Sequence, residues 1–363
     1  MKHPRLLLLI FVYMASVVGF AQSNPTTAPT GITIVPKAVK PEKAKKFNEK
    51  DLSGYLMVYF KDHNQSAYMA ISKDGYTFTD INGANPIFIG SELAEQKGVR
   101  DPHIARGPDG AFYLAMTDLH ISGKRAGFRE TEWQRPAEKY GWGNNRALVL
   151  MKSYDLIHWS HAIIRVDLAF PELGDIDCSW APETVYDPVK KKMMVYFTIR
   201  YNNKECHMYY SYANDDYTKL ETLPTRITEI GGLDGDITKV GNQYQMFYVS
   251  NARILHATSN EINRGYPVNT KRIDPEKVNT EAPNLFKRLG TDKYVLMYDV
   301  YGLRPSNMGF SETSDFVNFT NLGRFNEGVM KTTNFSSPKH GAVTYLTSDE
   351  MQAIINHWKV NIK

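Results

Sequence analysis

Short runs of aromatic and β-branched residues recur along the chain, with polar turns between them. Five runs have the length and composition of buried strands: Tyr55–Phe60, Phe112–Thr117, Met194–Thr198, Tyr244–Val249 and Tyr294–Val300. No long amphipathic helical pattern appears before the end of the chain. The pattern therefore predicts an all-β protein that is built from repeated units.

Two further patterns flank these runs. A turn containing Ser and Asp, followed by an aromatic residue, comes after three of them, at Ser72–Phe78, Ser153–Trp159 and Ser314–Phe319. A polar segment that begins another strand comes before four of them: Asp101-Pro-His-Ile, Trp180-Ala-Pro-Glu, Leu233-Asp-Gly-Asp and Thr280-Glu-Ala-Pro. Each repeat therefore holds several strands of one sheet.

The two ends of the chain complement each other. No polar segment precedes the run Tyr55–Phe60, and an unmatched strand, Lys339–Leu346, lies near the other end. We therefore predict a five-bladed β-propeller of four-stranded sheets, closed by pairing of the N- and C-terminal segments. A many-stranded β-sandwich is the alternative, but it does not explain this complementarity. Ser348–Trp358 predicts a short C-terminal helix that is capped by Ser348.

The composition narrows the class of protein. A chain of 363 residues with 42% hydrophobic and 23% charged residues can bury a sizeable core and is not wholly disordered. A net charge of +4 is too small and too scattered to predict nucleic-acid binding. Two cysteines, Cys178 and Cys206, exclude a disulfide-rich scaffold, and the sequence leaves open whether they form one bridge.

The N-terminus has the pattern of a secretory signal peptide. Lys2 and Arg5 precede the apolar run Leu6–Phe20, which is short for a membrane anchor, and Ala21 suits cleavage. We expect a signal peptide over residues 1–21, a mobile leader over 22–50 and a propeller domain over 51–363. We therefore expect a secreted, periplasmic protein of a Gram-negative bacterium, monomeric and without membrane contact after cleavage.

In a propeller, the starts of the inner strands meet at one mouth of the central channel. Polar residues begin these strands, namely Asp101, Glu183, Asp234 with Asp236, Glu281 and His340. Glycoside cleavage needs such a funnel, because one carboxylic acid protonates the leaving oxygen and a carboxylate activates water or attacks carbon. A third acid nearby keeps the proton donor protonated.

Four motifs resemble those of glycoside hydrolase family 43, which are inverting, five-bladed propeller enzymes acting on arabinose- and xylose-containing polysaccharides. The motifs are Asp101-Pro-His-Ile, Trp180-Ala-Pro, Leu233-Asp-Gly-Asp-Ile and Glu281-Ala-Pro, with Ala282 where the family usually has Gly. The resemblance covers most of residues 52–347. It implies that Asp101 is the general base, Asp234 the residue that tunes the pKa of the acid, and Glu281 the general acid. Asp236 stays open as the alternative to Asp234.

Sugar sites also need flat apolar faces and hydrogen-bond donors. We predict substrate contacts from Trp180, from Trp142 in the long insert His120–Asn145, and from Arg304 and His340. Packing inside the insert is the alternative for Trp142, and a surface role is the alternative for Arg304. The resemblance implies that His340 lies near the channel axis, where some relatives hold a calcium or other ion through water. A hydrogen-bonded histidine without metal is the alternative, and the chemistry requires no cofactor.

The combined prediction is a secreted, inverting hydrolase of α-L-arabinofuranosyl or β-D-xylosyl linkages in plant-type polysaccharides or oligosaccharides. A galactan-directed exo-glycosidase of the same fold and a non-catalytic carbohydrate-binding propeller are the alternatives. Arg100-Asp-Pro resembles a motif of the retaining, fructan-hydrolysing propellers, but the Asn-Asp-Pro nucleophile of that class is missing here. The sequence leaves the sugar, the linkage and exo or endo action open.

Overall fold

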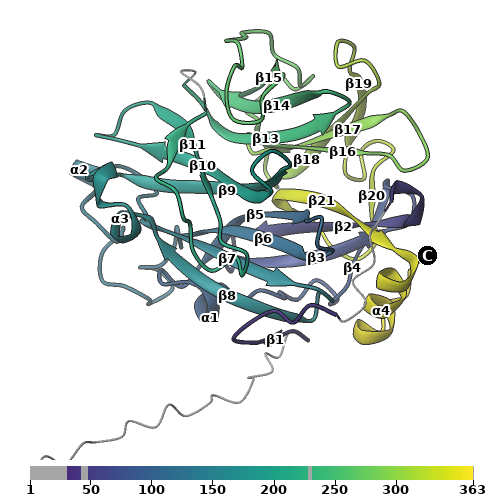
Figure 1. The fold of residues 1–363 in the computed structure, drawn as a ribbon, viewed down its shortest axis with the longest axis horizontal. Helices are drawn as coiled ribbons and strands as arrows, with labels where there is room; N and C mark the ends of the chain where they lie inside the picture. Colours follow the sequence, from purple (N-terminus) through teal and green to yellow (C-terminus); the bar gives the residue numbers. More distant parts are fainter. Residues whose placement is uncertain (1–30, 42–47, 228–230, 363) are drawn as a thin grey trace, which may run out of the picture.

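The computed structural model describes residues 31–41, 48–227 and 231–362, and its strands form five sheets arranged around a central axis (Figure 1). The first sheet contains, from the channel outward, β5 (Val99–Arg106), β6 (Phe112–Asp118), β7 (Ala147–Ser153) and β8 (His158–Arg165). The second contains β9 (Cys178–Asp187), β10 (Lys192–Arg200), β11 (Cys206–Tyr212) and β12 (Thr225–Arg226). The third contains β13 (Leu233–Val240), β14 (Gln243–Ser250) and β15 (Arg253–Ser259), and the fourth β16 (Glu281–Lys287), β17 (Tyr294–Val300), β18 (Asn307–Thr313) and β19 (Thr320–Arg324).

The fifth sheet closes the ring and joins both ends of the chain. Its strands, from the channel outward, are β21 (Lys339–Thr347), β2 (Leu52–Lys61), β3 (Ser66–Ser72), β4 (Thr77–Asp80) and β20 (Lys331–Thr332). β21 pairs with β2 in antiparallel register, with Tyr345 opposite Tyr55 and Ala342 opposite Val58 (Figure 1). The predicted five-bladed propeller, closed by its terminal segments, is therefore confirmed. Within the described residues the third sheet has three strands rather than the expected four.

The core lies between neighbouring sheets. All five predicted aromatic runs form the second strand of a sheet, which is covered on both faces. Their patterns are therefore continuously apolar rather than alternating. In β2, for example, the fully buried Tyr59 stacks on Tyr68 with ring centroids 5.1 Å apart, and its hydroxyl donates to Asp80 at 2.7 Å.

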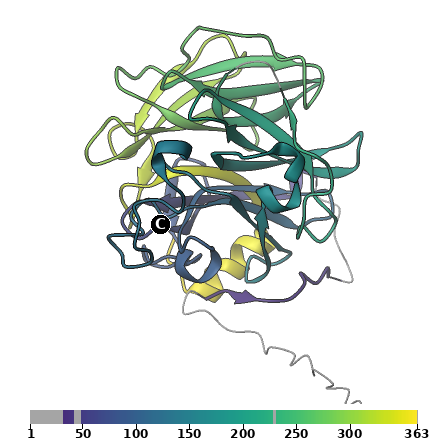
Figure 2. The same cartoon turned by 90° about the vertical axis from the view of Figure 1, so that its left-hand side faces the viewer.

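Part of the expected mobile leader is packed on the propeller. β1 (Thr33–Ile34) pairs in parallel with β8, and the neighbouring Ile32 is buried. Lys37 forms an ion pair of 2.8 Å with Asp216 in the second blade. This segment crosses the lower edge of the molecule beside the C-terminal helix (Figure 2). The expected signal peptide, residues 1–21, lies outside the described residues.

Helices are short and peripheral. They are α1 (Gly90–Leu93), α2 (Ala137–Tyr140), α3 (Val166–Ala169), α4 (Ser348–Trp358) and the 3-10 turns Glu49–Asp51 and Pro171–Leu173. α4 has the predicted bounds, but the predicted cap, Ser348, is wrong by one residue. Thr347 is the cap, because its hydroxyl accepts from the Glu350 N–H while the Glu350 carboxylate accepts from the Thr347 N–H. No helix in the described part of the chain is both long and apolar enough to cross a membrane.

The two cysteines are free thiols. Cys178 on β9 and Cys206 on β11 both lie opposite Arg200 of the intervening β10. Adjacent strands are about 4.8 Å apart, so these cysteines are about 9–10 Å apart, beyond the roughly 7 Å that a disulfide spans between Cα atoms. The sequence left open whether Cys178 and Cys206 form a disulfide, and their positions on either side of β10 show that they do not.

Candidate active site

All five inner strands are interrupted at the same place. The pairing register shifts there, and one residue of each strand takes a positive φ: Asp101 (50°), Ala181 (44°), Asp234 (50°), Ala282 (56°) and His340 (31°). The next residue is always Pro or Gly. A bulge of this kind bends the strand and redirects its side chains, and a proline N–H is not needed where pairing is broken. The fold thus gathers Asp101, Asp234, Glu281 and His340 from four blades around one point near the starts of the inner strands, and we call this cluster the funnel.

Asp101 is held as a carboxylate. Its Oδ2 accepts from the Thr117 hydroxyl at 2.7 Å, and that hydroxyl accepts from the Ala181 N–H at 2.8 Å. Its Oδ1 lies 3.2 Å from Nδ1 of His340. Burial alone would raise the pKa of Asp101, but the His340 charge and these hydrogen bonds outweigh it and hold the pKa well below its usual range. An ionised carboxylate is the state that a general base needs.

His340 is the positive partner of the acids. Burial would lower the pKa of its ring, but Asp101, Asp234 and Glu281 outweigh burial and raise it. Nδ1 is engaged with Asp101, so it is not free to bind a metal directly. A calcium or other ion held near His340 through water stays a prediction.

Glu281 begins β16, and its pKa is shifted in the opposite direction. Burial raises the pKa of its carboxyl and the Asp101 charge adds to this, while Lys339 and His340 oppose it, so that the pKa stays raised. Its side chain retains 28% of its surface exposed. A carboxyl with a raised pKa that is open to a ligand is suited to donate a proton.

The two aspartates of β13 differ in their surroundings. Burial, with the Glu281 and Asp101 charges, raises the pKa of Asp234 to about 7, and its carboxylate accepts from the Ala282 N–H. Asp236 is instead bound to the next blade, where Asn284 Nδ2 and the Leu285 N–H donate to it at 3.0 Å each. The bulge at Asp234 thus separates two side chains that a regular strand would place on one face, and it groups Asp234 with the other two acids.

A second layer of polar residues lies further along the inner strands β5, β9 and β13 than the bulges. The ligand-type atoms of His103, Glu183 and Asp236 are all within 4.8 Å of one another. However, His103 Nδ1 accepts from the Thr184 N–H, which leaves the proton on Nε2, and Glu183 accepts from the Tyr196 hydroxyl. Burial lowers the pKa of His103 to about 3 and raises that of Glu183 well above its usual range. An imidazole that presents an N–H does not fit a metal centre, and the layer is a hydrogen-bonded cluster.

Trp180 and the insert form an aromatic wall beside the start of β9. The Trp180 indole donates to the Gly143 carbonyl at 2.8 Å, and the Arg200 guanidinium lies 4.6 Å from its ring. Trp142 packs edge-on against it with centroids 5.9 Å apart, yet 57% of Trp142 is exposed. Trp142 and Trp180, the two predicted sugar-contacting tryptophans, are therefore in contact, and Trp142 keeps an exposed surface.

Arg304 lies apart from the acids. Its guanidinium donates to the backbone carbonyls of Tyr301 and Leu303 at 2.9 and 2.8 Å, in a separate hollow of about 250 Å³. Tyr301 is closer to the funnel, since the charges of Glu281 and Asp234 contribute, after burial, to raising its pKa.

Sequence reasoning missed several residues that contact the acids. Thr117 precedes the end of β6, Lys339 comes directly before His340, and Asp299 lies opposite Glu281 in β17. Lys339 Nζ is 3.6 Å from both Glu281 Oε1 and Asp299 Oδ2. The sequence did contain a signal for Lys339. It comes directly before the bulged residue of the fifth blade, and Glu281 holds the same position in the fourth blade.

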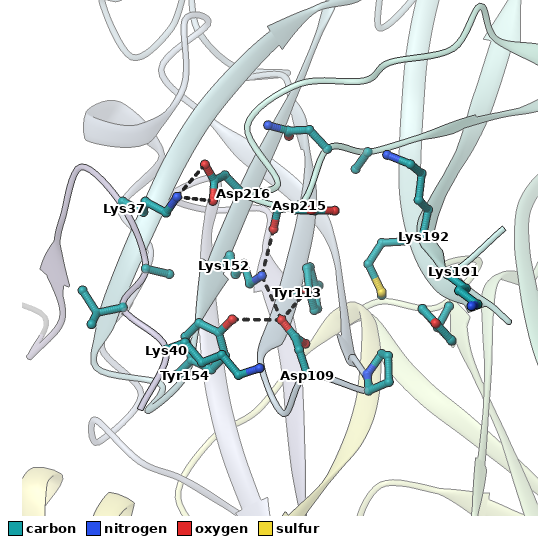
Figure 3. Close-up of a pocket in the computed structure, with 17 residues that line it drawn as sticks. Lys37, Lys40, Asp109, Tyr113, Lys152, Tyr154, Lys191, Lys192, Asp215 and Asp216 are labelled. Atoms are coloured by element: carbon teal, nitrogen blue, oxygen red, sulfur yellow. Dashed lines mark hydrogen bonds and ion pairs between the residues drawn. The ribbon is translucent and has the colours of Figure 1, made fainter. Parts of the chain in front are cut away.

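A hollow of about 620 Å³ is lined by Asp109, Lys152 and Asp215 among others (Figure 3). Its lining residues Pro108 and Tyr186 place it at the ends of β5 and β9 that are far from Asp101 and Trp180. Its carboxylates are mostly engaged with lysines, as in the pairs Lys37–Asp216 and Lys152–Asp109 at 2.8 and 2.9 Å. Asp109 and Asp216 are thus charge-paired in this hollow, whereas in the funnel three carboxyls surround one histidine. The funnel is the candidate active site.

The model of a family described as a probable glycosyl hydrolase domain, related to family 43, matches residues 50–352. Among solved structures, a thermostable family-43 glycoside hydrolase is similar at 14% identity and a TM-score of 0.49, over 71% of this chain and 82% of that one. A GH43_1 enzyme from Xanthomonas citri complexed with xylotriose is similar at 11% sequence identity and a TM-score of 0.46, over 62% of this chain and 73% of that chain. The catalytic domain of a GH62 α-L-arabinofuranosidase from Coprinopsis cinerea is similar at 14% sequence identity and a TM-score of 0.44, over 66% of this chain and 74% of that chain. No curated protein sequence matches the chain. Because the family model spans most of the propeller, the chain belongs to the glycosyl hydrolase family related to glycoside hydrolase family 43.

Proposed function

We propose that this glycoside hydrolase cleaves α-L-arabinofuranosyl or β-D-xylosyl linkages with inversion. Asp101 is the general base, Glu281 the general acid, and Asp234 tunes the pKa of the acid. One observation carries the proposal: two carboxyls in one funnel have pKa values shifted in opposite directions, downward for Asp101 and upward for Glu281. Such a difference assigns base and acid roles.

The reaction follows from these two states. Asp101 takes a proton from a water, and the oxygen of that water bonds to the anomeric carbon as the glycosidic bond breaks. Glu281 gives its proton to the departing oxygen. Inversion requires room for the water, that is, carboxyls about 6.5–9.5 Å apart. Repulsion from the Asp101 carboxylate raises the pKa of Glu281 and so favours the protonated acid, and Asp234, whose own pKa is raised beside Glu281, tunes this balance.

Trp142 and Trp180 supply flat faces for the sugar ring, which the aromatic wall would hold beside the acids. A wall on one side of the funnel favours exo action on oligosaccharide ends, and α-L-arabinofuranosyl is the first sugar to test. The N-terminal sequence supports export through a signal peptide over residues 1–21, followed by action as a periplasmic monomer.

Two other functions compete with this proposal. A galactan-directed exo-glycosidase would use the same acids on another sugar. A carbohydrate-binding propeller without catalysis would not need the opposite pKa shifts of Asp101 and Glu281, which argues against it.

The test is hydrolysis of nitrophenyl α-L-arabinofuranoside and nitrophenyl β-D-xyloside by the wild type and by Asp101→Ala. We expect turnover of at least one substrate by the wild type and its loss in the variant. Asp292→Ala, which removes an exposed carboxylate, is the control and should retain full activity. An active Asp101→Ala variant would disprove the base assignment. A wild type inactive on these and on galactosides would favour the binding propeller.

A further inference from the structure

Lys339 lies at the centre of three carboxyl groups. Its ammonium nitrogen is 3.4 Å from Asp62 Oδ2 and 3.6 Å from both Glu281 Oε1 and Asp299 Oδ2. Its side chain is 11% exposed. These distances are ion-pair distances but are long for hydrogen bonds, so the ammonium is shared among the three carboxyls.

Asp299 depends on this lysine. It is fully buried, and neither carboxyl oxygen has a hydrogen-bond partner in the described structure. A buried carboxylate is costly unless it is paired, and Lys339 is the cation beside it. The corresponding places in the first two blades are occupied by threonines, Thr117 opposite Arg100 and Thr198 opposite Trp180. The fourth blade therefore has a carboxyl group where the first two blades have a hydroxyl.

Asp62 anchors the lysine from the other side. It lies in the turn between β2 and β3, where Arg100 donates to its Oδ1 at 2.8 Å, and the buried Gln65 also accepts from Arg100 at 3.1 Å. Because Arg100 fixes Asp62, the ammonium of Lys339 is held next to Glu281 by carboxyls on two sides.

We propose that Lys339 is a positioning residue for the acid: Asp62 and Asp299 hold its ammonium where it becomes the counter-ion of Glu281 once Glu281 has given up its proton. The inference rests on the proposed function and deepens it. In the step, the O–H bond of Glu281 breaks and an O–H bond forms on the leaving oxygen. The new carboxylate is neutralised by Lys339, which keeps all its protons, and Glu281 regains a proton from solvent.

Charged or titratable groups face Glu281 from every element around it: Arg100 and Asp101 of β5, Asp234 of β13, Asp299 of β17, Tyr301 after β17, Lys339 and His340 of β21, and, beyond Lys339, Asp62. The Lys339 cation favours an ionised Glu281, whereas the Asp299 carboxylate disfavours it. Removing one or the other should therefore shift the titration of Glu281 in opposite directions.

The experiment is an NMR titration of the Glu281 side-chain carboxyl in ¹³C-glutamate-labelled protein, with the signal assigned by its loss in Glu281→Gln. Lys339→Met should raise the pKa of Glu281 by about one pH unit or more, and Asp299→Asn should lower it. Lys152→Met is the control, because it removes another buried lysine that pairs with Asp109 at the far hollow, and it should change nothing. Unchanged titration in both variants, or shifts of the same sign, would overturn the proposal.

A kinetic readout separates this inference from the proposed function. The alkaline limb of kcat/KM should move to higher pH in Lys339→Met and to lower pH in Asp299→Asn. A wild type that hydrolyses no glycoside would refute the proposed function, while the titration would still decide the role of Lys339. An active wild type whose Glu281 titrates alike in all variants would refute the inference on Lys339 alone. If Lys339→Met does not fold, the near-isosteric Asp299→Asn decides by the sign of its shift.

Discussion

Each acid of the funnel has a protonation state set by its immediate neighbours. Asp101 and Glu281 are both shielded by neighbouring blades, yet Asp101 has an imidazolium at 3.2 Å and a hydroxyl donor at 2.7 Å, whereas Glu281 shares its nearest cation with two other carboxyls. Burial penalises the charge of both, and only Asp101 is fully compensated. At the residue scale, the difference between proposed base and acid is therefore a difference in cations and hydrogen-bond donors.

His340→Gln tests the cation. Without its charge, burial dominates and the pKa of Asp101 rises, by about one to three pH units. Because the base must be ionised, the acidic limb of kcat/KM should move to higher pH. The measurement is the pH profile of kcat/KM for the wild type and the variant. An acidic limb that stays in place would show that His340 does not hold Asp101 ionised.

Thr117→Val tests the hydroxyl donor. It removes one hydrogen bond to the Asp101 carboxylate and leaves the Ala181 N–H without its acceptor. A hydrogen bond to a charged group is worth about 1.5–3 kcal/mol, so kcat/KM should fall about 10- to 100-fold. Thr198→Val, at the same place in the next blade, is the matched control, because its hydroxyl accepts from the Asp234 N–H at 3.3 Å and donates to no acid in the described structure. Equal losses in the two variants would contradict the role of Thr117.

At the scale of the element, the bulge that every inner strand carries is what aims these side chains. The bulge can be recognised in the sequence, because Pro or Gly follows the bulged residue in all five strands. This regularity explains why Asp101, Asp234 and Glu281 could be recognised as strand starts from the sequence. It does not explain Thr117 or Asp299, because each acts on a residue that lies on another strand or in another blade.

Ala282 tests the bulge itself. At a φ of 56°, a β-branched side chain is strained, and Ala282 is buried, so Ala282→Val should lower the free energy of unfolding by about 1–3 kcal/mol. Activity should fall as well, since the Ala282 N–H donates to Asp234. Ala282→Gly relieves the strain and should stay folded and active. Denaturant unfolding of both variants is the measurement, and a valine variant as stable as the wild type would contradict this account.

At the scale of the whole molecule, the ring closes through strands from opposite ends of the chain. The unmatched segments near Tyr55 and Lys339 made this closure predictable, because each lacked a partner in its own neighbourhood. The docking of residues 31–41 was not predictable from their Pro- and Lys-rich composition. It depends on the buried Ile32 and on pairing with β8, a strand more than a hundred residues away.

Gly341→Val tests the closure. A Cβ at this position would lie 2.3 Å from the Val58 carbonyl oxygen of the partner strand, so the variant should lose about 1–3 kcal/mol of unfolding free energy. Gly290→Ala is the control, because it adds a side chain where nothing lies within 4 Å, and its cost is confined to a φ of 72°. Thermal unfolding compares the two. If Gly341→Val unfolds at the same temperature as Gly290→Ala, closure of the ring does not depend on close contact between β2 and β21.

The most direct test of the central claim compares Glu281→Gln and Asp101→Asn on two kinds of substrate. One is an aryl glycoside with a good leaving group, which needs no protonation, and the other is an oligosaccharide of the same sugar, which does. We expect Glu281→Gln to lose turnover of the oligosaccharide far more than turnover of the aryl glycoside, and Asp101→Asn to lose turnover of both. Equal losses on both substrates in Glu281→Gln, or an active Asp101→Asn, would contradict it.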